Sequence, residues 1–207
     1  MRVVAGEARG RHLSAPEGRD TRPTSDRVRE AIFNSLRSMD RIDGALVVDL
    51  FAGSGALGIE ALSRGAAHCT FVEKHRGAVA VIEANLAATK LADRAEVRVA
   101  DVLAYVARAG SADLVLADPP YAFDGWTDLL GALHAPFVVI ESDRAIEPPV
   151  PWVVVRCQRY GTTVVTFASR ETDIEPTVPE PTALDAGSSA LGRADDTEPV
   201  REGRNSS

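Results

Sequence analysis

Apolar segments of strand length alternate with helical segments along most of this chain, and no other feature of the sequence constrains the fold as strongly. The predicted strands lie at residues 45–50, 69–73, 95–99, 112–117 and 137–141. The predicted helices between them lie at residues 56–62, 78–86, 102–107 and 126–133. The first strand is a continuous apolar run, which is typical of a parallel sheet covered on both faces. The pattern predicts a doubly wound α/β sheet.

The last two predicted strands break this alternation. They lie at residues 152–156 and 163–167 and are joined through residues 159–162, without room for a helix between them. Strands joined in this way must be antiparallel. The sheet should therefore be mostly parallel and end in an antiparallel hairpin, which plain dinucleotide-binding domains do not normally show.

The residues before the sheet are predicted to form a small extension. Residues 2–15 have the pattern of a short β-hairpin, and a helix follows whose apolar positions are Val28, Ile32 and Leu36. Ser25 or Thr24 is placed to cap this helix. Because a helix N-terminus also attracts carboxylates and phosphates, the same two residues are candidate ligand contacts.

Length and composition favour one folded domain with appendages. The chain has 207 residues, of which 45% are hydrophobic, enough for one sizeable core. We expect a hairpin and helix at 1–40, a sheet domain at 41–168, and a disordered acidic tail rich in Pro and Ser at 169–207. No apolar run approaches the roughly 20 residues that span a bilayer. The first residues lack the apolar core of a signal peptide, so we expect a cytoplasmic protein.

The net charge of −7 does not exclude a nucleic-acid partner, because the charges are unevenly distributed. From residue 169 onward four arginines stand against nine acidic residues, whereas residues 1–37 hold eight arginines and five acidic residues. Nucleic-acid binding depends on a local basic surface rather than on the total charge. Arg9 and Arg11, at the predicted hairpin turn, are placed either to reach phosphates or simply to face solvent.

The cysteines and histidines do not form a metal-binding pattern. Cys69 and Cys157 each lie inside an apolar strand, which indicates buried thiols rather than a disulfide framework. The four histidines are scattered, and none has zinc-ligand spacing to another candidate ligand. We therefore predict no metal site.

A glycine-rich turn follows the first strand of the sheet. Residues 53–58, Gly-Ser-Gly-Ala-Leu-Gly, match GxGxxG between a strand and a helix. Glycines let the backbone approach a ligand closely, so this turn indicates a bound ligand without identifying it. The carboxylate of Asp49, at the end of the strand, would repel a pyrophosphate but would suit a cationic amine such as that of a methionine moiety.

Acidic residues also follow the next two strands. Glu73 ends the second strand, where a carboxylate can accept both hydroxyls of a ribose. Asp101 follows the third strand and can accept from an adenine amino group with Val102 beside the ring, although an aspartate that precedes a helix is often simply its N-cap. An amine, a ribose and an adenine along the carboxyl ends of three neighbouring strands describe S-adenosylmethionine, which we expect as the cofactor.

The fourth strand ends in Asp118-Pro119-Pro120-Tyr121. The two prolines fix the backbone and remove two N–H donors, so that the carbonyl groups of Asp118 and Pro119 point outward. The Asp118 carboxylate and the Pro119 carbonyl can accept the two hydrogens of one amino group, while Tyr121 offers a ring for stacking. An exocyclic amine of a nucleobase fits this description. An ordinary strand-ending turn is the alternative.

Together these segments resemble a known family. Residues 49–58 and 118–121 look like the class I S-adenosylmethionine-dependent methyltransferases that modify exocyclic amines. Residues 22–30, Arg-Pro-Thr-Ser-Asp-Arg-Val-Arg-Glu, narrow the resemblance to the RsmD family of small-subunit (16S) ribosomal RNA guanine-N2 methyltransferases. The resemblance covers residues 1 to about 168 and leaves the tail unexplained.

The resemblance implies a seven-stranded Rossmann-like sheet and methyl transfer to N2 of the guanine called G966 during 30S subunit assembly. The partner would be 16S ribosomal RNA within a 30S subunit or an assembly intermediate, and we expect a monomer with no membrane association. Thr24 and Ser25 would lie near the methionine carboxylate, and residues 118–121 would form the catalytic motif. The other cofactor contacts would be Asp49, Phe51, Gly53, Gly55, Glu73, Asp101, Val102 and Asp118. The phosphate contacts would be Arg9, Arg11, Arg22 and Arg159.

Three other functions are compatible with parts of the sequence. A DNA adenine-N6 methyltransferase uses the same four-residue motif, more often with Asn in the first place. NAD-dependent redox chemistry would use the glycine turn but leaves residues 118–121 and the terminal hairpin unexplained. A non-catalytic RNA-binding assembly module would retain the same fold.

Overall fold

The computed structural model describes residues 1–16 and 26–171. All of them belong to one compact unit. Its elements in chain order are α1 (Asp26–Ser38), β1 (Leu46–Leu50), α2 (Ala56–Ser63), β2 (His68–Glu73), α3 (Arg76–Thr89), the 3-10 turn η1 (Ala92–Arg94), β3 (Ala95–Val99), α4 (Val102–Val106), β4 (Leu114–Ala117), α5 (Trp126–Ala132), β5 (Phe137–Ser142), β6 (Trp152–Tyr160) and β7 (Thr163–Arg170).

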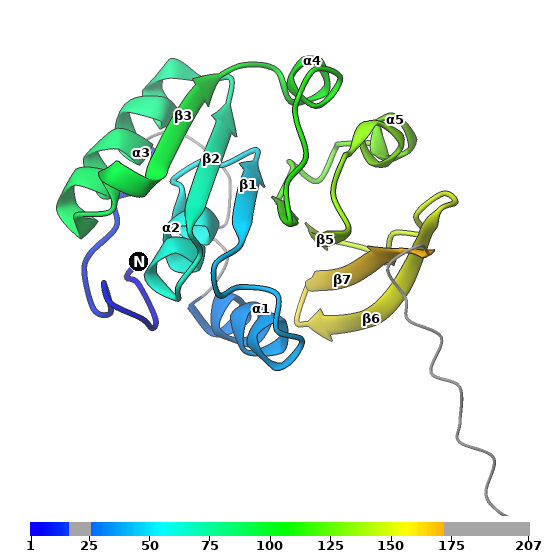
Figure 1. Cartoon of the computed structure of the whole chain (residues 1–207), viewed down its shortest axis with the longest axis horizontal. Helices are drawn as coiled ribbons and strands as arrows, with labels where there is room; N and C mark the ends of the chain where they lie inside the picture. The colour runs from blue at the N-terminus through cyan, green and yellow to red at the C-terminus, as the bar shows by residue number, and fades with distance from the viewer. Residues whose placement is uncertain (17–25, 172–207) are drawn as a thin grey trace, which may run out of the picture. The chain divides into compact units, whose positions relative to one another are not determined.

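The strands form one seven-stranded sheet in the order β3-β2-β1-β4-β5-β7-β6 (Figure 1). The first five strands of this order run parallel, and β7 is antiparallel to both β5 and β6. The predicted fold class, a mostly parallel doubly wound sheet that ends in an antiparallel hairpin, is confirmed. The chain order reverses between β1 and β4, where ligands of open α/β sheets bind.

Helices cover both faces of the sheet. One apolar cluster joins the N-terminal segment and helices α1, α2 and α3 to one face, and it includes Val47 of β1. The other joins α4 and α5 to the opposite face and includes Leu50 of the same strand. Because successive side chains of a strand point to opposite faces, a strand buried on both must be apolar at nearly every position. The continuous apolar runs of the sequence follow from this burial.

The predicted N-terminal hairpin is shorter than expected. It turns back as predicted and contains one antiparallel bridge, between Arg2 and His12. Beside the bridge, the Val3 amide donates to the Arg11 carbonyl and the Leu13 amide to the Met1 carbonyl, both at 3.0 Å. The Val4 and Ala5 amides bind elsewhere, because they donate to the carboxylate of Glu60 on α2 at 2.8 and 3.0 Å. The first residues thus form a short backbone ladder and are also attached to the helix after the glycine turn.

Strand β6 is the outermost strand of the sheet and is longer than predicted, because it continues through Arg156–Tyr160 as the partner of β7. A β-bulge lies between Val154 and Arg156. Cys69 is buried as predicted, but the prediction of a buried thiol at Cys157 is wrong. Cys157 is exposed because β6 is covered on neither face from Val153 to Arg159, where every side chain is exposed. Among the described helices, none has the length and apolarity needed to cross a bilayer.

Candidate active site

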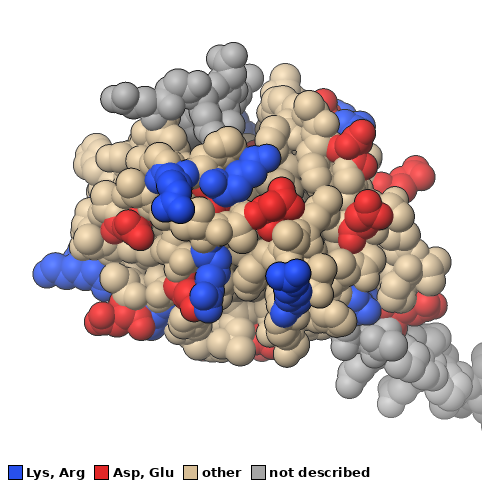
Figure 2. Space-filling view, turned by 90° about the horizontal axis from the view of Figure 1, so that it is seen from above, with Lys and Arg blue, Asp and Glu red and all other residues tan. Residues whose placement is uncertain are grey.

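The parallel strands β1, β2, β3 and β4 end at the same edge of the sheet. Leu50 pairs with Ala117 and with Val72, and Glu73 pairs with Val99. The residues that follow these strand ends therefore lie along one edge, as the sequence predicted. Figure 2 shows the molecule from above, relative to the view of Figure 1. On this face basic and acidic side chains are interspersed rather than segregated.

The glycine turn has the backbone that its sequence requires. Gly53 and Gly55 have φ angles of 57° and 77°, in the left-handed region that glycine adopts without penalty. A Cβ on Gly58 would meet the Phe71 ring at 2.3 Å and the Cys69 sulfur at 2.7 Å. The third glycine therefore allows α2 to pack closely against β2, while the first two shape the turn.

Asp49 is 1% exposed and lies beneath this turn. Its Oδ2 accepts a hydrogen bond from the Gly58 amide at 2.9 Å. Burial raises the pKa of Asp49 well above its ordinary value, the Gly58 hydrogen bond lowers it, and the charges of Asp118 and Glu73 raise it. The carboxylate that we expected to face a cofactor amine thus also fixes the start of α2, and one cation in the site would offset the repulsion between these three carboxylates.

Glu73 connects the second strand to the glycine turn. It is 3% exposed, and its Oε2 accepts from the Gly53 amide at 3.0 Å while Oε1 accepts from the His75 amide at 2.9 Å. A carboxylate held in this orientation has the acceptor chemistry that the two hydroxyls of a ribose require. The geometry gives Glu73 a structural role in holding the glycine turn, which the sequence did not reveal.

Asp101 is the N-cap of α4. Its Oδ1 accepts from the amides of Leu103 at 3.0 Å and Ala104 at 3.3 Å. The capping alternative is therefore present in the structure, and the exposed carboxylate retains Oδ2 for an adenine amine. Val102 is buried in the apolar cluster beside it.

The motif at residues 118–121 begins directly after β4. Pro119 is buried, and Tyr121 is 49% exposed, so its ring is available to a partner. The Phe123 amide donates to the Pro120 carbonyl at 2.8 Å, which closes a turn after the prolines. The prediction of a rigid corner with an exposed aromatic ring agrees with this geometry.

Three aromatic rings support the corner, and sequence reasoning missed two of them. The Phe51 and Phe123 centroids lie 5.1 Å apart, and those of Phe123 and Trp126 lie 5.0 Å apart, both pairs edge to face. Phe51 has a left-handed φ of 57°, which is costly for a bulky residue, and this places its ring against Phe123. Aromatic residues two and five positions after Tyr121 were the available signal.

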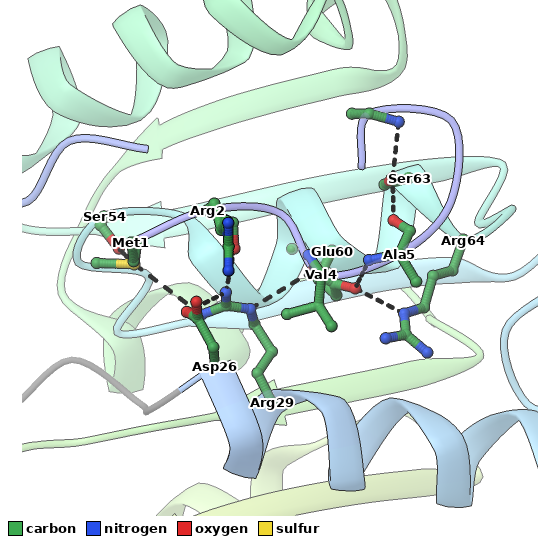
Figure 3. A network of polar contacts seen from close by, with 12 residues as sticks. Met1, Arg2, Val4, Ala5, Asp26, Arg29, Ser54, Glu60, Ser63 and Arg64 are labelled. Carbon is green, nitrogen blue, oxygen red and sulfur yellow. Dashed lines mark hydrogen bonds and ion pairs between the residues drawn. The ribbon is translucent and has the colours of Figure 1, made fainter. Parts of the chain in front are cut away.

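A buried polar network joins the N-terminal segment to the site and was also missed. Glu60 is fully buried and accepts from Arg64 Nε at 2.7 Å and from Arg29 Nε at 3.4 Å. Figure 3 shows these two arginines approaching Glu60 beside the N-terminal segment. On α3, the Asn85 amide nitrogen donates to the carbonyls of Ser14 and of Ser54 in the glycine turn, at 3.0 and 2.9 Å.

The predicted RNA-binding residues are in different surroundings. Arg9 is exposed at the hairpin turn, and Arg159 is exposed near the end of β6. Arg11 is half-buried and donates from NH1 to the Ala88 carbonyl at 3.0 Å, so it is anchored to α3. Arg22, Thr24 and Ser25 lie outside the described residues.

The edge of the sheet fits S-adenosylmethionine in its donor chemistry. A Cβ on Gly53 would meet no atom closer than the Phe51 carbonyl at 3.7 Å, which leaves this backbone open to a ligand. Carboxylates stand at the ends of β1 and β2, and Asp101 follows β3. These groups suit a cationic amine, two hydroxyls and an adenine amine in that order.

Comparisons with known proteins agree with this geometry. The family model described as "Conserved hypothetical protein 95" matches residues 1–169. "Putative rRNA methyltransferase YlbH" of Bacillus subtilis is 38% identical over 179 residues, which is 80% of this chain and 96% of the relative. "Ribosomal RNA small subunit methyltransferase D" of Escherichia coli is 43% identical over 122 residues, 58% of this chain and 60% of that relative.

A solved structure shares the fold. "Putative methyltransferase yhhF from Escherichia coli" superposes with a TM-score of 0.73 at 34% identity, over 83% of this chain and 98% of that one. The predicted activity and cofactor are confirmed, because the chain is an S-adenosylmethionine-dependent methyltransferase. It belongs to the conserved hypothetical protein 95 family, which is the RsmD family of methyltransferases named by the sequence resemblance.

Proposed function

We propose that this methyltransferase methylates the exocyclic N2 of a guanine in the 16S ribosomal RNA of the small subunit, with G966 as the target. It acts as a monomer in the cytoplasm while the 30S subunit is assembled. The observation that carries the proposal is the pairing of Leu50 with Ala117, because it sets the glycine turn and residues 118–121 side by side. The names of the relatives from Bacillus subtilis and Escherichia coli support ribosomal RNA as the substrate class.

We assign one group of residues at this edge to binding the cofactor and another to binding the target base. Asp49, Glu73 and Asp101 would hold the cofactor through its amine, ribose and adenine. S-adenosylmethionine, when bound, supplies a methyl group on a positively charged sulfur. Because each of these acids already accepts a backbone amide, its orientation is fixed before any ligand arrives. Preorganisation of this kind lowers the entropy cost of binding.

Asp118 and Pro119 would activate the acceptor nitrogen. The N2 amine of guanine is a poor nucleophile because its lone pair is delocalised into the ring. Acceptors at the Asp118 carboxylate and the Pro119 carbonyl would hold both hydrogens and return the lone pair to nitrogen. Positioning then supplies most of the acceleration, and Asp118 or water receives the released proton.

Tyr121 would receive the target base. A base inside structured RNA cannot present N2 to this corner without leaving its stack. The half-exposed Tyr121 ring offers it a new stacking surface, and the exposed Arg9 and Arg159 would bind flanking phosphates. The aromatic contacts of Phe51, Phe123 and Trp126 keep the corner in place.

The proposal is tested by methyl transfer from labelled S-adenosylmethionine to three acceptors: undermethylated small ribosomal subunits, naked 16S ribosomal RNA, and DNA. Label in ribosomal RNA is the expected result. Label in DNA alone would mean that the protein is a methyltransferase whose substrate is an adenine in DNA. If the protein binds the cofactor and labels none of the three, the ribosomal RNA proposal is wrong and an assembly module becomes the better account.

A further inference from the structure

A polar groove separates α1 from the edge strand β6 on the face of the sheet that α1 covers. Its volume is about 320 Å³, and it is open to solvent. The lining residues are Ala31, Asn34, Ser35 and Ser38 of α1 with Arg156, Gln158 and Tyr160 of β6. None of these residues is acidic. In Figure 1, the end of β6 reaches α1.

The charge of Arg156 is balanced by neutral groups only, as far as the described residues show. Its NH1 donates to the Ser35 hydroxyl at 3.1 Å, and its NH2 donates to Gln158 Oε1 at 2.7 Å. These bonds fix the guanidinium and leave three of its five N–H groups for another acceptor. A fixed, uncompensated guanidinium in an open groove attracts an anion.

The groove extends toward the catalytic edge. Arg27, Ala31, Asn34 and Ser38 are spaced by four, three and four residues, so they form one stripe along α1 that begins with an exposed arginine. Through β7, Arg159 of β6 aligns with Ser142, the last residue of β5. The β6 wall of the groove therefore has one end at the edge where the parallel strands finish.

The first turn of α1 also lies near the glycine turn. The sulfur of Met1 is 4.0 Å from Arg29 NH1 and 3.8 Å from the Ser54 hydroxyl. The first turn of α1 therefore lies at the catalytic edge, beside the residues that follow β1. Small-molecule pockets are mostly apolar and concave, whereas this groove is open and lined by hydroxyl, amide and guanidinium groups.

We propose that the groove between α1 and β6 binds the sugar-phosphate backbone of the RNA substrate beyond the target nucleotide. This inference rests on the proposed function. Arg156 and Arg27 contact phosphates, and Asn34, Ser38 and Gln158 offer hydrogen bonds to phosphate oxygens and 2′-hydroxyls. The outer edge of β6, which pairs with no other described strand, adds backbone N–H groups. The groove contributes affinity and orientation rather than chemistry.

Two substitutions test this inference without removing a residue of the cofactor or catalytic site. Asn34→Asp adds a negative charge to the groove and keeps the acceptor that binds Arg64 NH1 at 3.1 Å, so the fold is retained. Arg156→Gln removes the positive charge and keeps a polar side chain. Arg108→Gln, an exposed arginine after α4, is the charge-matched control. Melting temperatures and cofactor affinity verify that each variant is folded.

The assay measures binding of a 16S RNA fragment over a series of salt concentrations. We expect Asn34→Asp and Arg156→Gln to weaken binding roughly tenfold. The slope of log affinity against log salt should become shallower by about 0.7–0.9 for each phosphate that the variant no longer binds. The control should bind like the wild type. Affinities and slopes that equal those of the wild type in both groove variants would overturn the inference.

Two further outcomes are distinguishable. If the variants bind naked RNA normally but methylate intact subunits more slowly, the groove contacts a protein of the particle and the RNA assignment is wrong. If the wild type itself methylates no ribosomal RNA while it binds the cofactor, the proposed function has failed. In that case, weakened RNA binding by the two groove variants would still support an RNA-binding groove.

Discussion

Glu60→Gln tests whether the buried polar network holds the N-terminal segment in place. Glu60 accepts from the amides of Val4 and Ala5, from Arg64 Nε at 2.7 Å and from Arg29 Nε at 3.4 Å. A glutamine has nearly the same shape but only one acceptor oxygen. Its amide nitrogen would point N–H groups at donors that the carboxylate now binds.

The expected magnitude follows from burial. Glu60 and Arg29 are both 0% exposed, and breaking a buried ion pair by removing one charge costs about 3–5 kcal/mol. A buried amide left without an acceptor costs about 1–3 kcal/mol, but the Val4 and Ala5 amides are only partly buried. Arg29 also retains Asp26 at 2.9 Å and the Arg2 carbonyl, so the costs do not add in full. We expect a total loss of about 3–5 kcal/mol, which lowers the melting temperature by about 6–20 °C in a protein of this size.

Thermal denaturation followed by circular dichroism measures the shift. Glu83→Gln is the matched control, because Glu83 is exposed on α3, and surface substitutions usually change stability by at most about 0.5 kcal/mol. If Glu60→Gln melts within the range of this control, the network does not stabilise the fold and the inference from burial is wrong.

Three further predictions concern the site. Gly58→Ala should lower stability by about 1–3 kcal/mol in urea denaturation, because its Cβ would meet the Phe71 ring at 2.3 Å; Gly131→Ala, with nothing within 4 Å, should not. Burial raises the folded-state pKa of the Asp49 carboxyl group well above its ordinary value of 3.8. The protonated carboxyl group therefore stabilises the fold fully below pH 3.8, and this stabilisation is lost as the pH rises through the folded-state pKa. Asp49→Asn should therefore gain in melting temperature over the wild type as the pH rises, and a constant difference would contradict this. Asp118→Ala should reduce the methyl-transfer rate by about 100-fold or more and leave cofactor affinity nearly unchanged in calorimetry; an equal loss of both would refute this division of roles.

Strand positions were largely predictable because buried parallel strands are continuous apolar runs. The first was predicted at 45–50 and begins at Leu46. The fourth begins at Leu114 rather than at 112. At Asp113 the amide still donates to the Leu46 carbonyl at 2.9 Å, but the Leu46 amide donates to the Asp113 carboxylate at 2.8 Å and not to a backbone carbonyl. The end of β6 was missed because Arg156–Tyr160 forms an exposed edge and lacks the apolar signal.

The candidate site was predictable where several consecutive residues together indicate one function. The glycine turn and residues 118–121 are two such runs. Glu60 does not, because a glutamate in a helix usually faces solvent, and its partners Arg29 and Val4 lie 31 and 56 residues away. The groove between α1 and β6 was equally hidden, since it joins Ser35 to Arg156 across 121 residues of sequence.

Identification of the methylated nucleoside tests the central claim most directly. Undermethylated small subunits are incubated with the wild type or with Asp118→Ala. The 16S ribosomal RNA is then digested and its nucleosides are analysed by mass spectrometry. Primer extension maps the position of the methylated nucleoside. The account predicts N2-methylguanosine at the G966 position with the wild type and none with Asp118→Ala. A methylated adenosine, or methylation on another atom of guanine, would contradict it.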